Sequence, residues 1–179
     1  PTVYDGYDGK NIPAHASTYM IYQEGIYVGY KYYETRYEDY VMGTGNAGDY
    51  AYGDDVAFPF GYGLSYTTFS IRCAEVRADG TVIHLKAAVT NTGDRPGKEV
   101  AQLYVSAPED GLDKEYQSLA TFGKTGELAP GESEILQLRF DLGDLASYRE
   151  KDNCFVLEQG DYILRLGNAS CNTAVADDA

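Results

Sequence analysis

The segment Thr-Val-Ile-His-Leu-Lys-Ala-Ala-Val-Thr-Asn, residues 81–91, decides the fold class. Its apolar side chains fall on every second position and alternate with polar or small ones. Successive side chains of a strand point to opposite faces, so this period of two predicts a strand with one buried face. The predicted inward row is Ile83, Leu85, Ala87 and Val89, and the outward row is His84, Lys86, Ala88 and Thr90.

Three further segments repeat this alternation. Their inward rows are Ala101/Leu103/Val105, Leu136/Leu138/Phe140 and Tyr162/Leu164/Leu166. Weaker strand patterns cover Phe69–Val76, Ala120–Glu127 and Cys154–Glu158, which brings the total to about seven short strands. We therefore predict an all-β fold, an immunoglobulin/fibronectin type III-like two-sheet sandwich. Tyr148 precedes the penultimate strand and is a candidate for the tyrosine corner of such folds.

Turn residues separate the predicted strands. They are Asp79-Gly80, the longer run Asn91-Thr92-Gly93-Asp94 with Pro96-Gly97, Ala129-Pro130-Gly131 and Gln159-Gly160-Asp161. Glycine permits positive φ and proline fixes φ, so these groups favour reversals of chain direction. Short strands joined by such turns are typical of antiparallel sheets.

Charge restricts the classes of partner. The 179 residues carry 28 acidic and 14 basic side chains, a formal net charge of −14. Nucleic acids and anionic membranes are polyanions and favour basic surfaces, so we predict neither as a partner. No stretch approaches the ~18 consecutive apolar residues of a membrane helix. A neutral ligand such as a sugar is compatible with this charge.

The first third of the chain differs in composition from the rest. Residues 1–66 hold 14 of the 18 tyrosines, and we place a domain boundary there, with residues 1–68 before it and residues 69–179 after it. Aromatic residues and interior glycines in Tyr19–Glu34 predict an extended element, and the composition of Val41–Asp55 predicts a loop. The part from Phe58 to Tyr66 is predicted to lie against the sandwich. Because residues 1–66 contain so few aliphatic side chains, we expect them to pack against a part of the protein that this sequence lacks.

Several stretches resemble glycoside hydrolase family 3, the β-glucosidases and β-xylosidases. They are residues 24–33 (EGIYVGYKYY) and 58–69 (FPFGYGLSYTTF), then Asn91-Thr92-Gly93, residues 97–105 (GKEVAQLYV), Phe122-Gly123-Lys124 and residues 128–132 (LAPGE). The resemblance covers essentially the whole chain. It implies that residues 1–68 are the end of that family's α/β sandwich domain, an irregular Tyr/Gly-rich segment, and that residues 69–179 are its fibronectin type III-like domain.

The resemblance also implies a chemistry that this sequence does not contain. Family members retain anomeric configuration with an aspartate nucleophile, usually within Ser-Asp-Trp, and a glutamate acid/base. Such chemistry needs two carboxyl groups about 5 Å apart. The sequence has no Trp, and the acid/base stretch would lie before Pro1. We therefore assign no catalytic, cofactor-binding or metal-binding residue, and we expect the chain alone to be an inactive structural scaffold between domains.

Some residues nevertheless invite a functional interpretation. Glu24 lies among aromatics, but a structural glutamate bonded to backbone near Gly25 is the favoured interpretation. Asp54 and Asp55 are interpreted as solvated loop charges. The tyrosines of Tyr22–Tyr40 are able to stack on sugar rings, but interdomain packing is favoured.

The histidines and cysteines give no metal signature. His15 and His84 stand alone, and His84 is predicted to be exposed. Cys73, Cys154 and Cys171 lack zinc-site spacing and are interpreted as buried or half-buried apolar side chains, with one intrachain disulfide left open. The stretch Asn168-Ala169-Ser170 fits a glycosylation sequon, whose meaning depends on a compartment that the sequence does not specify.

Two functions remain to be compared. In the first, the chain is part of a β-glucosidase-like enzyme, its partners are that enzyme's catalytic domains, and the full enzyme hydrolyses terminal β-D-glucosyl residues. In the alternative, it is a free-standing carbohydrate-binding or adhesion module that uses the Tyr-rich segment. We also expect self-association through that segment. Pro1 in place of Met suggests a piece of a longer protein, and the order of its domains stays open.

Overall fold

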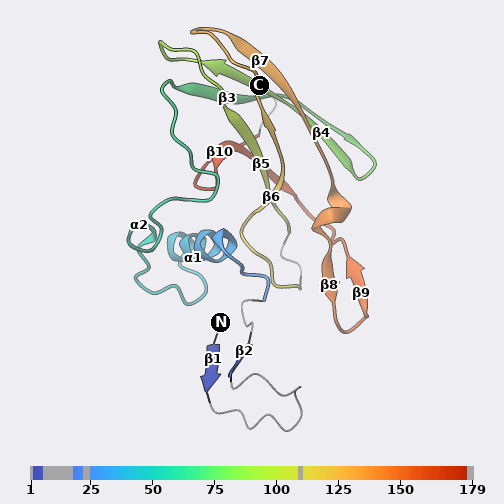
Figure 1. The fold of residues 1–179 in the computed structure, drawn as a ribbon. Coiled ribbons are helices and arrows are strands. Elements are labelled where there is room, and N and C mark those ends of the chain that lie inside the picture. Colours follow the sequence, from blue (N-terminus) through green and yellow to red (C-terminus); the bar gives the residue numbers. More distant parts are fainter. Residues whose placement is uncertain (1, 6–17, 22–24, 109–110, 177–179) are drawn as a thin grey trace.

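Two antiparallel sheets form most of the computed structural model, which describes residues 2–5, 18–21, 25–108 and 111–176 (Figure 1). One sheet has the order β3-β4-β7 and the other the order β11-β10-β5-β6. Their strands are β3 (Phe69–Asp79), β4 (Val82–Asn91), β5 (Val100–Ser106), β6 (Ser118–Lys124), β7 (Ser133–Asp141), β10 (Ile163–Ala169) and β11 (Asn172–Val175). The predicted two-sheet sandwich is confirmed.

The core lies where the alternation predicts it. Ile83, Leu85, Ala87 and Val89 on β4 are all buried, and β7 pairs with β4 so that Leu138 lies opposite Leu85. β5 departs from a one-sided pattern, because Gln102 and Tyr104 on its other face are buried as well. That outer face is therefore covered by another part of the chain.

A hairpin extends from the sandwich, and only its second strand was predicted. A 3₁₀ turn, η1 (Leu142–Leu145), leads into β8 (Ser147–Arg149), which pairs with β9 (Cys154–Val156). The sequence did not predict β8 or β11, so the described part of residues 69–179 contains nine strands where about seven were expected.

The tyrosine-corner prediction for Tyr148 is wrong. Tyr148 lies on β8, and its hydroxyl bonds the side chain of Asn153 further along the chain. The hydroxyl of Tyr162 instead donates to the backbone carbonyl of Glu158, four residues upstream, at 2.8 Å. This backward bond at the start of a strand is the geometry of a tyrosine corner.

In the Tyr-rich segment, residues 1–68, helices replace part of the extended element expected for Tyr19–Glu34 and part of the loop expected for Val41–Asp55. β1 (Thr2–Asp5) pairs with β2 (Thr18–Ile21), and α1 (Tyr30–Met42) and α2 (Tyr52–Asp55) follow. α1 ends at Gly43, whose left-handed backbone (φ 67°) lets its N–H reach the carbonyl of Asp39. Packing against the sandwich outweighs the weak helix propensity of the tyrosines. Among the described residues, no helix has the length and apolar character needed to cross a membrane.

The linker between the helices and β3 is fixed by Asn91. This fully buried residue accepts from the hydroxyl of Thr67 at 2.8 Å and donates to the carbonyls of Arg95 and Leu128. The N–H of Thr92 also bonds the carbonyl of Thr68 at 2.8 Å. The chain leaving the helices is therefore held at one end of the sandwich, as Figure 1 shows.

Candidate functional site

Glu34 joins the sandwich to residues 30–66, which contain α1 and α2 and which we call the helical segment. It is the buried residue of α1, with 3% of its surface exposed. Its Oε1 accepts from the hydroxyl of Ser170 at 2.8 Å and from the hydroxyl of Tyr52 at 2.7 Å. Ser170 belongs to the β10–β11 turn and Tyr52 to α2. One carboxylate oxygen thus connects both helices to the sandwich.

Aromatic rings pack beside this carboxylate. The ring of Tyr30 stacks on Phe60, with centroids 4.3 Å apart, and meets Tyr104 edge-on at 6.1 Å. The hydroxyl of Tyr30 accepts from the N–H of Leu119 at 2.8 Å. Burial raises the pKa of Tyr30 and, more strongly, that of Tyr104. Offset and edge-on aromatic pairs contribute about 0.5–1.5 kcal/mol beyond the area they bury.

Polar groups of β5 complete the contact. The hydroxyl of Tyr104 donates to Gln102 at 2.6 Å, and Gln102 donates to the carbonyls of Gly61 and Asn168. The N–H of Ser170 also donates to the carbonyl of Phe60 at 2.9 Å. The prediction that Phe58–Tyr66 lies against the sandwich is therefore correct at Phe60 and Gly61, whereas Leu64 and Tyr66 are 89% and 94% exposed. We call Tyr30, Glu34, Gln102, Tyr104 and Ser170 the helix dock.

A second set of contacts continues from α1 to the loop before β6. Lys31 pairs with Glu115 at 2.5 Å, and the N–H of Tyr116 donates to the hydroxyl of Thr35 at 2.8 Å. Burial alone would raise the pKa of Glu115, but hydrogen bonds from Lys31 and Ser118 outweigh it and lower that pKa below its usual range. The carboxylate is thus held ionised against the helix.

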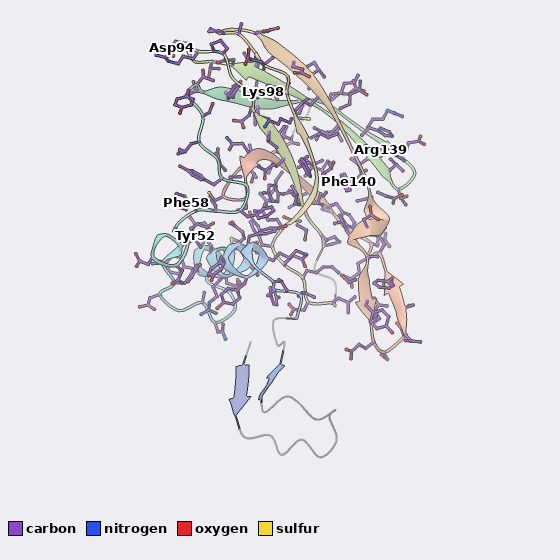
Figure 2. All side chains as sticks on the ribbon, in the orientation of Figure 1. Tyr52, Phe58, Asp94, Lys98, Arg139 and Phe140 are labelled. Carbon is purple, nitrogen blue, oxygen red and sulfur yellow. The ribbon has the colours of Figure 1, made fainter. Side chains whose placement is uncertain are left out.

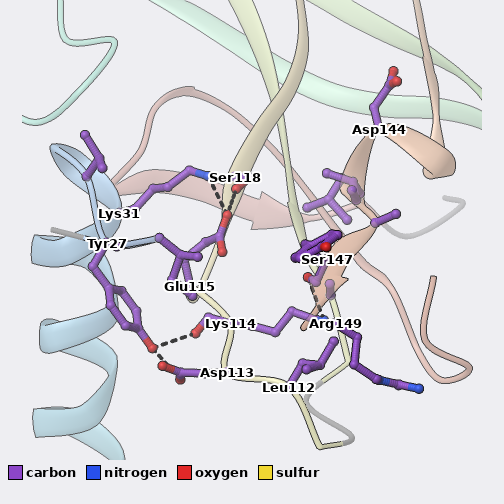
Figure 3. Close-up of a pocket in the computed structure, with 18 of the residues that line it drawn as sticks. Tyr27, Lys31, Leu112, Asp113, Lys114, Glu115, Ser118, Asp144, Ser147 and Arg149 are labelled. Atoms are coloured by element: carbon purple, nitrogen blue, oxygen red, sulfur yellow. Dashed lines mark hydrogen bonds and ion pairs between the residues drawn. The ribbon is translucent and has the colours of Figure 1, made fainter. Parts of the chain in front are cut away.

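A cavity of about 1390 Å³ opens beside this loop (Figure 3). Residues 25–28 and Lys31 line one side, residues 112–115 lie below, and residues 144–151 of η1 and the hairpin line the other side. The hydroxyl of Tyr27 reaches Asp113 Oδ1 at 2.6 Å and the carbonyl of Lys114 at 3.2 Å. We call this space the lateral cavity.

A buried ion group fixes the hairpin beside the lateral cavity. Lys114 and Glu158, which expose 6% and 3% of their side chains, pair at 2.7 Å. Lys114 also donates to Ser147 at 3.0 Å, and Arg149 lies 3.6 Å from the other oxygen of Glu158. Desolvating such charges is costly unless they are paired. The group therefore specifies how the loop, the hairpin and the chain before β10 meet.

The residues singled out in the sequence do not gather into a catalytic site. Glu24 and His15 lie outside the described residues. Asp54 and Asp55 end α2 and are exposed, as expected, and His84 is half-buried rather than exposed. No group of three or more His, Cys, Asp or Glu side chains able to hold a metal ion occurs in the described parts of the chain.

The cysteine prediction is only partly correct. Cys73 is half-buried on β3, but Cys154 and Cys171 are exposed, and the three thiols form no disulfide with one another. Cys154 lies on the hairpin and Cys171 in the turn after Ser170, both of which extend from the core. Alternating patterns do not extend to such projections, so the sequence could not show their exposure.

Sequence reasoning missed Glu34 and Ser170. The spacing of Tyr30 and Glu34, four residues apart, places both on one face of a helix, and a helical reading of the segment would have identified them. Ser170 was considered only within the sequon, but it is 2% exposed and its hydroxyl is bonded to Glu34. Asn168 of the same sequon supplies a backbone carbonyl to Gln102.

The outer side of the helical segment exposes apolar and aromatic side chains. Tyr37 is 46% exposed, Tyr40 47% and Phe58 71%, although the opposite side of α1 contacts the sandwich. Figure 2 shows Tyr52 and Phe58 together at this end of the molecule, far from Arg139 on β7. This distribution agrees with a segment that is packed on one side only.

Comparison with known proteins gives matches along most of the chain. Residues 99–170 match the model of the fibronectin type III-like domain. The chain is 37% identical over 178 residues to β-glucosidase A of Butyrivibrio fibrisolvens, covering 89% of the chain and 20% of that protein. It resembles the crystal structure of a β-glucosidase from Paenibacillus barengoltzii at 40% identity, with a TM-score of 0.73, covering 87% of the chain and 16% of that structure. It also resembles the structure of β-glucosidase 3B from Thermotoga neapolitana at 41% identity, with a TM-score of 0.69, covering 85% of the chain and 19% of that structure. The chain thus spans about a fifth or less of these proteins.

Proposed function

Because residues 99–170 are a fibronectin type III-like domain of the kind present in family 3 β-glucosidases, we propose that this chain is the non-catalytic scaffold of such an enzyme. The full enzyme would hydrolyse terminal β-D-glucosyl residues with retention of configuration. Residues 1–68 would be the end of its α/β sandwich domain and residues 69–179 its fibronectin type III-like domain.

The observation that carries this proposal is the helix dock. Glu34 is buried and accepts one hydrogen bond from Ser170 of the sandwich and one from Tyr52 of α2. α1 is therefore held on the sandwich by a defined contact rather than by loose apolar packing. Its outer aromatic side is left for another surface. A scaffold needs both properties, because it must hold one domain firmly and present that domain to the next.

The chemistry assigns catalysis to other parts of the enzyme. Retaining hydrolysis requires a nucleophilic carboxylate and an acid/base carboxyl about 5 Å apart across the glycosidic bond. Glu34, the buried carboxylate of the helical segment, is committed to two hydroxyl donors and does not line the lateral cavity. The buried carboxylate of Glu158 is committed to Lys114.

An assay with p-nitrophenyl β-D-glucoside tests the proposal on the chain itself. We expect no hydrolysis above that of buffer. Turnover that Glu24→Gln abolishes would contradict the proposal and make Glu24 catalytic. Asp54→Asn, which removes an exposed carboxylate of α2, is the matched control for a nonspecific effect of lost charge.

A further inference from the structure

We propose that the lateral cavity is a binding site for a neutral oligosaccharide, with Tyr148 as its stacking platform and Asp113 and Arg149 as its polar contacts. This site goes beyond the scaffold role. The choice of a β-linked glucan as probe rests on the proposed function, whereas the class of ligand follows from the cavity itself.

The charge of the cavity argues against an anionic ligand. Four basic and four acidic side chains line it, so its formal charge is 4 − 4 = 0, although the whole chain carries −14. Lys31 and Glu115, both in the lining, form an ion pair with each other, and Lys114 forms an ion pair with Glu158. Arg149 pairs with Asp152 and Glu158 outside the lining, which leaves Lys151 against Asp113, Asp144 and Glu150. An anionic ligand would therefore find no excess of positive charge.

The lining combines apolar faces with hydrogen-bonding groups. Ile26 and Val28 are 43% and 55% exposed on one side, and Tyr148 is 46% exposed on the other. Figure 3 shows Asp113 beside Tyr27 on the first side and Arg149 beside Ser147 on the opposite side. A pyranose ring has apolar C–H faces, which suit an aromatic or aliphatic surface, and hydroxyls at its edge, which suit a carboxylate and a guanidinium.

The cavity is also large and its walls are positioned in advance. Its 1390 Å³ exceeds the roughly 300–1,000 Å³ of sites for drug-sized ligands, which leaves room for several sugar units. The ring of Tyr148 packs edge-on against Phe155, with centroids 5.3 Å apart. The buried pair of Lys114 and Glu158, with the half-exposed Arg149 beside it, fixes the hairpin that carries both rings. A site held in this way loses less conformational entropy when a ligand binds.

Titration of the full chain with cellotetraose, followed by amide chemical shifts, tests the site. We expect saturable shifts confined to residues 25–31, 112–118 and 144–151, with a Kd of about 1 mM. Tyr148→Ala should weaken binding by about tenfold, the loss of one stacking contact. Tyr37→Ala is the matched control, because Tyr37 is equally exposed, at 46%, but lies on α1 and does not line the cavity. It should leave binding unchanged.

Three results would overturn the site: no saturable shift at about ten times that concentration, equal binding by Tyr148→Ala, or loss of binding in Tyr37→Ala. The last result would instead support a binding module built on the Tyr-rich segment. If Tyr148→Ala loses its dispersed spectrum, the near-isosteric Asp113→Asn decides, and it should also weaken binding. A chain that binds no sugar leaves the scaffold proposal unaffected, since the scaffold is tested by hydrolysis.

Discussion

Replacing Ser170 by alanine should release α1 while leaving the sandwich folded. The change removes only the hydroxyl that donates to Glu34 at 2.8 Å. The two backbone bonds of Ser170, to Phe60 and from Gln117, do not involve the side chain and remain. Glu34 then keeps the donor on Tyr52 but loses the one that crosses to the sandwich.

The expected magnitude follows from the burial of both partners. A hydrogen bond to a charged group contributes about 1.5–3 kcal/mol, and Glu34 and Ser170 are only 3% and 2% exposed, so solvent cannot replace the donor easily. If this loss falls on the docking of α1, amide exchange in the helix should rise roughly 10- to 100-fold, since about 1.4 kcal/mol corresponds to a factor of ten.

Hydrogen exchange measured by mass spectrometry distinguishes local from global effects. Peptides from α1 should exchange faster, and peptides from β4 and β7 should not change. Tyr52→Phe is the matched variant. It removes the other hydroxyl that donates to the same oxygen of Glu34, but the bond lost lies within the helical segment and does not cross to the sandwich. It should loosen α2 more than it loosens α1. Equal acceleration in β4 and α1, or none in α1, would refute the role of the helix dock.

Three further predictions concern stability and exposure. Leu138→Ala should lower the free energy of unfolding by about 2–5 kcal/mol, whereas Arg139→Ala on the exposed face of the same strand should change it little; equal losses in urea unfolding would invalidate the assigned faces. The lowered pKa of Glu115 means that its stabilisation is present above about pH 4.3, the ordinary pKa of an unfolded glutamate, and is lost as pH falls through the folded value. At pH values below about 4.3 the urea midpoint of unfolding should therefore decrease, and it should decrease less in Glu115→Gln. An equal decrease with pH in that variant would exclude this ion pair as the cause. In the native protein Cys154 should react with Ellman's reagent before Cys73, and the reverse order would contradict their exposures.

The sandwich was predictable because its signal is local and repeated. A strand with one face on the core must alternate, so Leu85 and Leu138 were assigned inward from the sequence alone. The same reasoning fails on the outer face of β5. Gln102 and Tyr104 are polar enough to seem exposed, but the helical segment covers them, and no property of β5 itself encodes that cover.

The helix dock was not predictable for a related reason. Tyrosines and flanking glycines favour an extended chain locally, and only contact with the sandwich stabilises α1. Ser170 lies 136 residues from Glu34, so no sequence window contains both. β8 was missed because it has only three residues, too few to show a period, and its partner β9 was expected only as the weaker pattern at Cys154–Glu158. The local alternation of apolar and polar residues therefore could not predict single long-range contacts between polar residues.

Hydrolysis by a chimera tests the central claim most directly. The catalytic part of the Paenibacillus barengoltzii β-glucosidase would carry this chain in place of its matching region, with a deletion of that region as the control. The scaffold account predicts that the chimera hydrolyses p-nitrophenyl β-D-glucoside, that the deletion does not, and that Glu24→Gln within the chimera leaves the rate unchanged. A folded chimera without activity, or a deletion as active as the chimera, would contradict it.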